Sequence, residues 1–386
     1  MTHTYIVHYG ELGLKGRNRK LFEQQLVTNI KAALNSYCEN KVKRFHSHIL
    51  VELPGKCPVG DIETCLSQIF GIAYFAPVTL VALNMEEITQ AALKMAAGII
   101  TEEVTFRVTT SRGEKSFPFT SMEVSREVGA HIVAQSRAQV NLWNPDYVVR
   151  IQIYQEAAYM FIRRIPGAGG LPVGSSGRIL TLFSGGIDSP VAAHLMMKRG
   201  CEVDFLHFHL LANQAQIHES KILKMARAVI SPHQFPAQVY MVSAAPFEAA
   251  VAAQDSRVTT VVFRRFIMRV AQHIAYQSRI PALVTGESVG QVASQTLQNI
   301  NVISRASDLP ILRPLVGMDK REIIDIAQEI GTYTLSIEPY KDPCSMHARH
   351  PSTWANIDAV LTLEKTIHME SLLAETIDRY IETITI

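Results

Sequence analysis

A short glycine-rich segment, Ser184–Ser189, has the residue types of an oligophosphate-binding turn. It reads Ser-Gly-Gly-Ile-Asp-Ser and lies between an apolar run, Ile179–Phe183, and a helix-like run, Pro190–Lys198. This order predicts a strand, a tight turn and a helix start. Paired glycines let a backbone approach a ligand closely, and the helix start offers N–H groups and the positive end of a dipole. The segment lacks the Gly-Lys-Ser/Thr ending of a Walker loop, which argues against kinase-like handling of a γ-phosphate.

Further polar residues that could contact a ligand lie in an expected loop and an expected helix of the same half of the chain. The segment Gly286–Thr296 comes after an apolar run, as a ligand loop of a doubly wound sheet does, and its Gln295 could contact a nucleotide. Arg264 and Arg265 are adjacent within a helical pattern. Because adjacent helical residues point in different directions, we expect one arginine at the site and the other in solvent.

The histidines and cysteines give little support for a metal site. His207 and His209 alternate at the end of an expected strand, but no third ligand accompanies them, so a nucleotide contact or a structural role is favoured. No Cys-x-x-Cys pair occurs, which disfavours zinc and iron–sulfur sites, and a reducing cytoplasm is the simplest interpretation.

One cysteine differs from the others in its surroundings. Cys344 lies in a proline-bounded basic segment, residues 340–351, whose cations could lower the pKa of its thiol. We therefore expect Cys344 to be accessible and reactive. The remaining cysteines lie in apolar or ordinary surface patterns and are expected to be inert: Cys38, Cys57, Cys65 and Cys201.

Two basic segments of the first half are typical of RNA contact. Gly10–Arg19 combines flexible glycines with cations that could hold RNA phosphates. Ser111–Ser121 interleaves cations with aromatic rings, which suits phosphate contact together with base stacking. The alternatives are a solvated turn for the first segment and buried packing of both rings for the second. The residues that could contact RNA are Lys15, Arg17, Arg112, Lys115 and Phe117.

The composition is that of a soluble globular protein with more than one domain. Its 386 residues exceed one ordinary core, and 47% of them are hydrophobic and 19% charged. The sequence shows no apolar run that could span a bilayer and no secretory signal. A net charge of +2 argues against an indiscriminate polyanion binder, so clusters of charge must carry any such binding.

The order of elements predicts three α/β parts and a linker. Residues 1–80 alternate as strand, helix, strand, strand, helix, strand, which fits a ferredoxin-like domain. Residues 81–166 predict two helices and further strands. Residues 167–177 are rich in glycine, proline and serine and predict a linker or hinge. From residue 178 strands alternate with helices up to a helical tail, which predicts a parallel sheet with helices on both faces.

The motifs in this order resemble a known family. Ser184–Ser189 resembles the PP-loop of ATP pyrophosphatases, which split ATP between the α and β phosphates and adenylate a substrate oxygen. With the other motifs it resembles the tRNA 4-thiouridine synthetase (tRNA sulfurtransferase) family over nearly the whole chain. The supporting segments are Gly10–Arg19, Lys115–Ser121, Gly286–Thr296 and Leu312–Lys320.

The resemblance implies an α/β fold and an activity. A doubly wound parallel-sheet PP-loop domain at 178–386 would follow α+β domains, ferredoxin-like at 1–80 and a tRNA-gripping THUMP domain at 81–166. The enzyme would use ATP and Mg²⁺ to adenylate the C4 oxygen of uridine 8 in tRNA and replace that oxygen with sulfur. A cysteine desulfurase would supply the sulfur as a persulfide, in the cytoplasm and without a membrane partner, and a homodimer is a further possibility.

The resemblance also implies roles for individual residues. Asp188 would belong to the catalytic loop, and Cys344 would carry the persulfide or resolve a disulfide. The ATP site would comprise Leu182, Phe183, Ser184, Gly185, Gly186, Ser189, His207, Phe208, Arg264, Gly286 and Gln295.

Two departures and two alternatives qualify this interpretation. Some relatives carry a C-terminal rhodanese domain, for which a chain ending at Ile386 leaves no room, so a thiazole-forming role in thiamine synthesis is not expected. Residues 210–214 lack the Ser-Pro-Pro usual in many members, which affects the nucleotide contacts expected there. The alternatives are another PP-loop enzyme, such as a 2-thiolase or an amide-forming ligase, and a catalytically inactive tRNA-binding protein. The N-terminal domains favour RNA over a small substrate, and the intact Ser184–Ser189 loop argues against inactivity.

Overall fold

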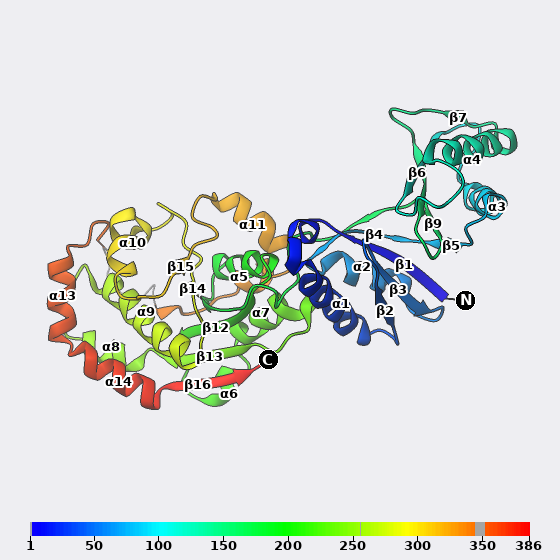
Figure 1. Cartoon of the computed structure of the whole chain (residues 1–386). Coiled ribbons are helices and arrows are strands. Elements are labelled where there is room, and N and C mark those ends of the chain that lie inside the picture. The colour runs from blue at the N-terminus through cyan, green and yellow to red at the C-terminus, as the bar shows by residue number, and fades with distance from the viewer. Residues whose placement is uncertain (1, 255, 344–351) are drawn as a thin grey trace. The chain divides into compact units, whose positions relative to one another are not determined.

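The computed structural model describes residues 2–254, 256–343 and 352–386 of the chain. These residues form two compact units, Met1–Gly170 and Leu171–Ile386 (Figure 1). The predicted linker, residues 167–177, contains the boundary between the two units, which falls after Gly170. The amide of Gly169 donates to the Ile72 carbonyl in the first unit, whereas the amide of Leu171 donates to the Lys198 carbonyl in the second.

The first sheet of the first unit has the predicted ferredoxin-like topology. Its strands are antiparallel and run in the order β10-β4-β1-β3-β2. The short β10 returns from a distant part of the chain to extend the sheet edge. The elements are β1 (Thr2–Tyr9), α1 (Arg19–Asn35), β2 (Lys41–Arg44), β3 (Ile49–Pro54), α2 (Val59–Gln68), β4 (Ile72–Pro77) and β10 (Ile165–Pro166).

The second sheet of this unit has two helices against one face. Its strand order is β5-β9-β8-β6-β7, and the α3 residue Ile88 and the α4 residue Val128 are fully buried in one core with Phe106 of β6. A capping box between Thr120 and Glu123 starts α4 at Ser121, because each side chain satisfies a backbone N–H of the other residue. The elements are β5 (Thr79–Val81), α3 (Met85–Ala96), β6 (Thr105–Arg112), α4 (Ser121–Ser136), β7 (Gln139–Val140), β8 (Tyr147–Ile153) and β9 (Ala158–Phe161).

The second unit is built on the predicted parallel sheet. The strand order is β15-β14-β11-β12-β13-β16, and all pairs are parallel except the one between β13 and β16. The prediction of a wholly helical tail is wrong, because Ile381–Thr385 forms β16. Four of its five residues are β-branched, which favours a strand over a helix. The other strands are β11 (Arg178–Leu182), β12 (Glu202–His209), β13 (Gln238–Ser243), β14 (Leu283–Val284) and β15 (Ile311–Leu312).

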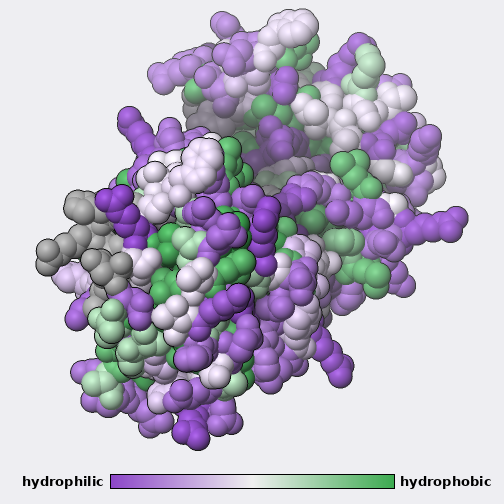
Figure 2. Space-filling view, turned by 90° about the vertical axis from the view of Figure 1, so that its left-hand side faces the viewer, coloured by the Kyte–Doolittle hydropathy of each residue, from purple (hydrophilic) through white to green (hydrophobic). Residues whose placement is uncertain are grey.

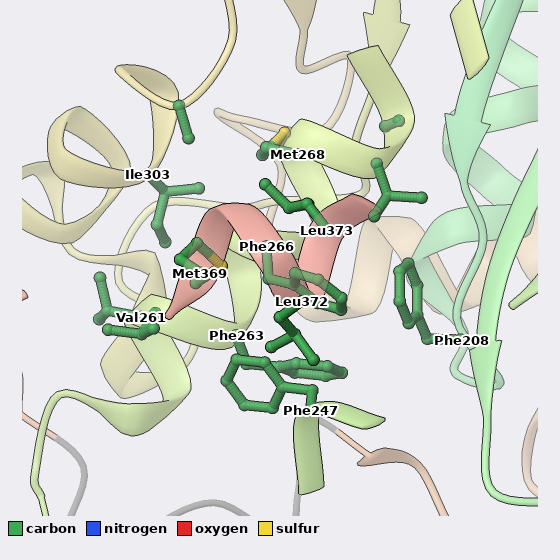
Figure 3. Packing of buried hydrophobic residues seen from close by; sticks show 14 of the residues in the cluster. Phe208, Phe247, Val261, Phe263, Phe266, Met268, Ile303, Met369, Leu372 and Leu373 are labelled. Atoms are coloured by element: carbon green, nitrogen blue, oxygen red, sulfur yellow. The ribbon is translucent and has the colours of Figure 1, made fainter. Parts of the chain in front are cut away.

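Helices cover both faces of this sheet. On one face α5 packs against β11, β12 and α7; on the other, α9 packs against β11, β14 and the C-terminal helices. Figure 3 shows the core on the α9 side of the sheet, where Phe247, Phe263 and Phe266 lie in one buried cluster with Leu372 and Leu373 of α14. The helices are α5 (Asp188–Lys198), α6 (Gln214–His218), α7 (Lys221–Ile230), α8 (Ala245–Val251), α9 (Thr259–Gln277), α10 (Leu297–Ser304), α11 (Lys320–Glu329), α12 (Tyr333–Ser336), α13 (Ile357–Thr366) and α14 (Met369–Arg379).

The surface is mostly hydrophilic, with apolar patches between polar side chains on the face seen in Figure 2. Several large apolar residues are exposed, including Val289, Val292 and Val316 of the second unit. Among the described residues, no helix combines the length and the apolar character that crossing a membrane requires.

The cysteines differ in part from the prediction. Cys38 and Cys57, expected only to be inert, form a disulfide because the turns after α1 and β3 bring their Cα atoms to 6.0 Å. Cys65 and Cys201 are free and buried. Burial raises the pKa of both thiols, to about 11 for Cys65, so neither is a ready nucleophile. Cys344 lies outside the described residues.

Candidate functional site

The glycine-rich turn is a closed loop between β11 and α5. The Ser184 amide donates to Ser189 Oγ at 2.9 Å, and the Gly186 amide donates to Ser184 Oγ at 3.2 Å. The Ser189 hydroxyl in turn donates to the Ser184 carbonyl at 3.2 Å. Both hydroxyls, expected from the sequence to face a ligand, therefore also fix the shape of the loop.

A pocket of about 140 Å³ opens at this loop, at the carboxyl ends of the parallel strands. This is where ligands bind in open α/β sheets. Most of the predicted ATP-contacting residues come together here, and Gly185 and Gly186 lie in the same loop. The pocket is lined by Leu182, Phe183, Ser184, Asp188, Ser189, Leu206, His207, Phe208, Arg264, Ile267, Met268, Thr285, Gly286, Gln295 and Asp342.

The segment Gly286–Thr296 begins with a glycine that lies directly against the Ser184–Ser189 loop. A Cβ at this position would lie 2.9 Å from the backbone of Asp188 and Ser189, a distance that real side chains do not tolerate. The absence of a side chain therefore lets the chain that leaves β14 pass directly against the Ser184–Ser189 loop.

Asp188 is held by two partners from distant parts of the chain. Lys320 Nζ lies 2.6 Å from Asp188 Oδ1, and Gln291 Nε2 donates to Oδ2 at 2.9 Å. The carboxylate therefore has a fixed direction at the first turn of α5. Lys320 was part of a motif in the sequence, but its contact with Asp188 depends on the neighbouring positions of α5 and α11.

A buried carboxylate organises the arginine side of the pocket. Glu287 Oε2 accepts from Arg313 Nε at 2.6 Å and from Thr285 Oγ1 at 3.0 Å, while its Oε1 lies 3.2 Å from Arg264 Nη1. Arg264 Nη1 also donates to Ser294 Oγ at 3.0 Å. One carboxylate thus faces two guanidinium groups, and this small cluster carries excess positive charge.

The expectation that the second arginine faces solvent is wrong. Arg265 is 4% exposed, and its Nε lies 2.6 Å from Glu364 Oε1. Its Nη1 donates to the Val302 carbonyl at 2.6 Å. The helix α9 is covered on this side by α10 and α13, so Arg265 serves packing between helices.

The two predicted histidines are buried and neutral. His207 Nδ1 lies 2.7 Å from the Phe183 carbonyl, so this nitrogen donates and Nε2 accepts from the Tyr340 hydroxyl at 2.6 Å. Burial lowers the pKa of His207 to about 3 and that of His209 to about 4. Across the described part of the chain, no group of three or more His, Cys, Asp or Glu side chains is placed to hold a metal.

Tyr340 and Lys221 contact the Ser184–Ser189 loop at Gly185, and sequence reasoning missed both contacts. A Cβ on Gly185 would lie 2.7 Å from Tyr340 Cδ1, so the ring packs directly on the glycine backbone. Lys221 Nζ donates to the carbonyls of Ser336, at 3.1 Å, and Glu338, at 2.7 Å. Burial raises the pKa of Tyr340 and lowers that of Lys221. The chain segment just before Cys344 is thereby fastened beside the loop.

The predicted RNA-contacting residues of the first unit have unequal surroundings. Arg17 and Lys115 are exposed, and Lys15 is half-buried with its Nζ 5.0 Å from the centre of the Phe22 ring. Lys15 and Arg17 lie at a pair of short 3₁₀ turns, Glu11–Leu14 and Gly16–Asn18.

The prediction of Phe117 as a stacking ring is wrong. Phe117 is 6% exposed and belongs to the core beneath α3 and α4. Arg112 Nη1 donates to the carbonyls of Phe117, at 3.1 Å, and Phe119, at 2.6 Å, and so folds the loop inward. The alternative of a packing role holds for Phe117, whereas Phe119 is 39% exposed.

Comparisons with known proteins cover the whole chain. Residues 174–369 match the family model "Thiamine biosynthesis protein (ThiI)", residues 4–76 match "ThiI ferredoxin-like domain", and residues 82–163 match "THUMP domain". A probable tRNA sulfurtransferase of Thermoanaerobacter pseudethanolicus is 38% identical, with 99% of this chain and 100% of that protein aligned. One from Moorella thermoacetica is 39% identical, over 100% of this chain and 98% of that protein.

A solved structure shares the fold. A crystal structure of a 4-thiouridine synthetase–RNA complex with bound ATP superimposes with a TM-score of 0.87 and 32% sequence identity, covering 100% of both chains. The predicted fold class, with ferredoxin-like, THUMP and parallel-sheet parts, is therefore confirmed.

Proposed function

This chain belongs to the ThiI family of tRNA sulfurtransferases, and we propose that it transfers sulfur to a tRNA uridine at the cost of ATP. The observation that carries the proposal is the pocket at the carboxyl ends of β11, β12 and β14, which gathers the phosphate loop and Arg264. The RNA and ATP bound in the crystal structure of the related 4-thiouridine synthetase support the same substrates here.

The pocket suggests how ATP is held. The β and γ phosphates would lie on the Ser184–Ser189 loop, at the N-terminus of α5, where helix N–H groups and the dipole favour anions. Arg264 adds positive charge that Glu287 keeps directed at the pocket. Of the carboxylates, Asp188 and Asp342 line the pocket, and oxygen donors with substrate phosphates are what Mg²⁺ prefers. A bound Mg²⁺ would neutralise phosphate charge there.

The proposed reaction has two steps. The C4 oxygen of the uridine attacks the α-phosphorus of ATP, and pyrophosphate leaves. A persulfide sulfur then attacks C4, and AMP departs with the former uridine oxygen. Fixed cations, Arg264 and Lys320, are suited to stabilise the charge that develops on phosphate oxygens, because their partners already hold them in place.

Cys344 is proposed to deliver the sulfur that a cysteine desulfurase supplies. The support is its sequence position, four residues after Tyr340, whose ring packs on the phosphate loop. The thiolate form would accept the persulfide sulfur and present it for attack. The terminal sulfur, once bonded to C4, is still joined to Cys344 Sγ. A thiol from outside this chain would attack Cys344 Sγ, which forms a mixed disulfide and releases the thiolated base, and a second external thiol would then reduce that disulfide and restore Cys344.

Substitution Cys344→Ser tests this role. It should block 4-thiouridine formation in an assay supplied by a cysteine desulfurase, while tRNA-dependent pyrophosphate release continues. The variants Cys65→Ser and Cys201→Ser, which change buried thiols, are the controls and should retain sulfur transfer. Wild-type 4-thiouridine formation by Cys344→Ser would contradict the assignment.

Nucleoside mass spectrometry tests the function as a whole. tRNA from a strain lacking this gene should contain no 4-thiouridine, and expression of the wild-type chain should restore it. An unchanged 4-thiouridine content after deletion would overturn the proposal, and loss of 2-thiouridine instead would favour another thiolase.

A further inference from the structure

A second recess lies beside the nucleotide pocket of the second unit. It has a volume of about 390 Å³, and its walls are two loops, Ser288–Gln291 after β14 and Val316–Lys320 after β15. The Val289 amide donates to the Val316 carbonyl at 3.3 Å, and Ser288 Oγ donates to the Met318 carbonyl at 2.8 Å. These bonds join the two loops into one surface.

The recess and the nucleotide pocket meet at Asp188. Gln291 and Lys320 belong to the walls of the recess, and both contact the Asp188 carboxylate, at 2.9 and 2.6 Å. Asp188 itself lines the nucleotide pocket. A molecule in the recess would therefore be separated from the bound nucleotide by little more than one carboxylate and its two partners.

The surface of the recess suits a flat ring with a polar edge. Val289 and Val316, 43% and 44% exposed, present apolar side chains at its rim. At Gly290 and Gly317 a Cβ would meet no atom within 4 Å, so the walls there are open. Apolar walls with a few polar groups are the usual composition of a site for a small organic ring. Gln291 supplies an amide, which can both donate and accept.

The reaction needs a second site of this kind. A base stacked in folded RNA must leave its stack before an enzyme can reach its ring atoms. The nucleotide pocket is the site proposed for ATP, so the target ring needs a place of its own beside it; typical sites for a small organic ligand measure roughly 300–1,000 Å³. The neighbouring recess of about 390 Å³ falls in that range.

We propose that this recess receives the uracil base of the tRNA nucleotide that is modified. Val289 and Val316 contact the ring, and Gln291 faces the polar edge that carries the N3–H donor and the C4 oxygen. The ring then lies next to Asp188, with its C4 oxygen directed toward the nucleotide pocket. The inference rests on the proposed sulfur transfer to tRNA and adds the place at which the target base binds.

Tryptophan substitutions at the rim test the inference. Val289→Trp and Val316→Trp fill the recess and should lower the rate of 4-thiouridine formation by about 100-fold, the effect of misplacing reacting atoms by an ångström. The affinities for ATP and for whole tRNA should change by about twofold or less, as for surface substitutions. Leu361→Trp, at a 39% exposed site on α13, is the matched control for the added ring.

Photocrosslinking of the product locates the base without altering the protein. A 4-thiouridine in tRNA crosslinks to adjacent residues under long-wave ultraviolet light, and mass spectrometry identifies the peptide. We expect crosslinks within 288–291 or 316–320. Crosslinks confined to other segments, or wild-type rates for both tryptophan variants, would overturn the inference. If the wild-type chain itself forms no 4-thiouridine, the proposed function fails instead, so the two failures are distinguishable.

Discussion

Charged residues in the pocket of the second unit and two cations in the basic loops of the first unit are held in different ways. In the pocket of the second unit, Asp188 is fixed by Lys320 and Gln291, and Arg264 is fixed by Glu287. In the basic loops of the first unit, Arg17 and Lys115 extend into solvent.

The difference matches the two functions proposed for these regions, which are catalysis in the second unit and RNA binding in the first. Stabilising a charge that develops during a reaction requires groups already in place, because reorganising them would raise the barrier. Attraction between lysine or arginine and an RNA backbone needs the charge and tolerates a mobile side chain. We therefore expect substitutions in the pocket to act on rate constants and substitutions in the basic loops to act on tRNA affinity and its salt dependence.

The largest expected effect is at Asp188. Asp188→Ala should abolish tRNA-dependent pyrophosphate release, because it removes the carboxylate that both Lys320 and Gln291 contact, while tRNA affinity stays nearly unchanged. Asp358→Ala, which removes an aspartate from the first turn of α13, is the control for a lost helix-start carboxylate. Normal pyrophosphate release by Asp188→Ala would show that the fixed carboxylate is not needed.

A second prediction compares the ion pair of Glu287 at the pocket with the ion pairs of Glu364, which lie away from the pocket. Glu287→Gln should raise the KM for ATP about tenfold, equivalent to about 1.4 kcal/mol, because Arg264 loses its counter-charge. Glu364→Gln removes a similar carboxylate between Arg265 and Arg269, away from the pocket. Both variants should unfold more easily, since each leaves buried guanidinium charge unpaired. An unchanged KM for Glu287→Gln would assign Glu287 to stability alone.

The pocket could be predicted only in part, and its contacts show why. Ser184–Ser189 was recognisable because a strand, a glycine turn and a helix start are contiguous in sequence. The pairing of Glu287 with Arg313, and of Asp188 with Lys320, depends on which strands and helices are neighbours, and a local pattern does not contain that information. Tyr340 was missed for the same reason, since it meets Gly185 across more than a hundred residues.

The failures in the first unit have a related cause. Phe117 lies in a basic segment of the sequence, yet its ring is buried in the core, and Arg112 donates to its backbone carbonyl. The disulfide between Cys38 and Cys57 joins two turns that are near only because α1 packs beside β2 and β2 pairs with β3. The ferredoxin-like order of strands was predictable, because it follows from the order of periodic segments.

Smaller effects are expected in the basic loops. Arg17→Ala should weaken tRNA binding a few-fold and reduce the slope of log affinity against log salt concentration by about one or less. The expected kcat for sulfur transfer at saturating tRNA is unchanged. Lys56→Ala, an exposed lysine outside both loops, is the control. A lowered kcat with unchanged tRNA affinity for Arg17→Ala would contradict the expectation that the basic loops act on tRNA affinity and the pocket on rate constants.

The smallest effect concerns acid stability. Burial lowers the pKa of four described histidines in the second unit, to about 3 or 4, and of two in the first unit, to about 4: His194, His207, His209 and His233, then His8 and His48. These folded-state values lie below the unfolded value of about 6.5, so below that pH protons bind the unfolded chain preferentially and stability falls.

Peptide-resolved proteolysis in urea measures this difference. Between about pH 7 and pH 5 the urea midpoint of the second unit should fall further than that of the first, because more of its histidines must stay neutral to fold. Replacing His233 by Gln should reduce the pH dependence of the second unit only. A larger acid shift in the first unit would contradict the prediction.

The central claim is that the fixed site of the second unit activates the uridine oxygen with ATP. A tRNA that carries heavy oxygen at C4 of the target uracil tests it directly when AMP is analysed by mass spectrometry after sulfur transfer. The account predicts one heavy oxygen in AMP for each 4-thiouridine formed, because that oxygen attacks the α-phosphorus and leaves with AMP. Formation of 4-thiouridine with unlabelled AMP would contradict it.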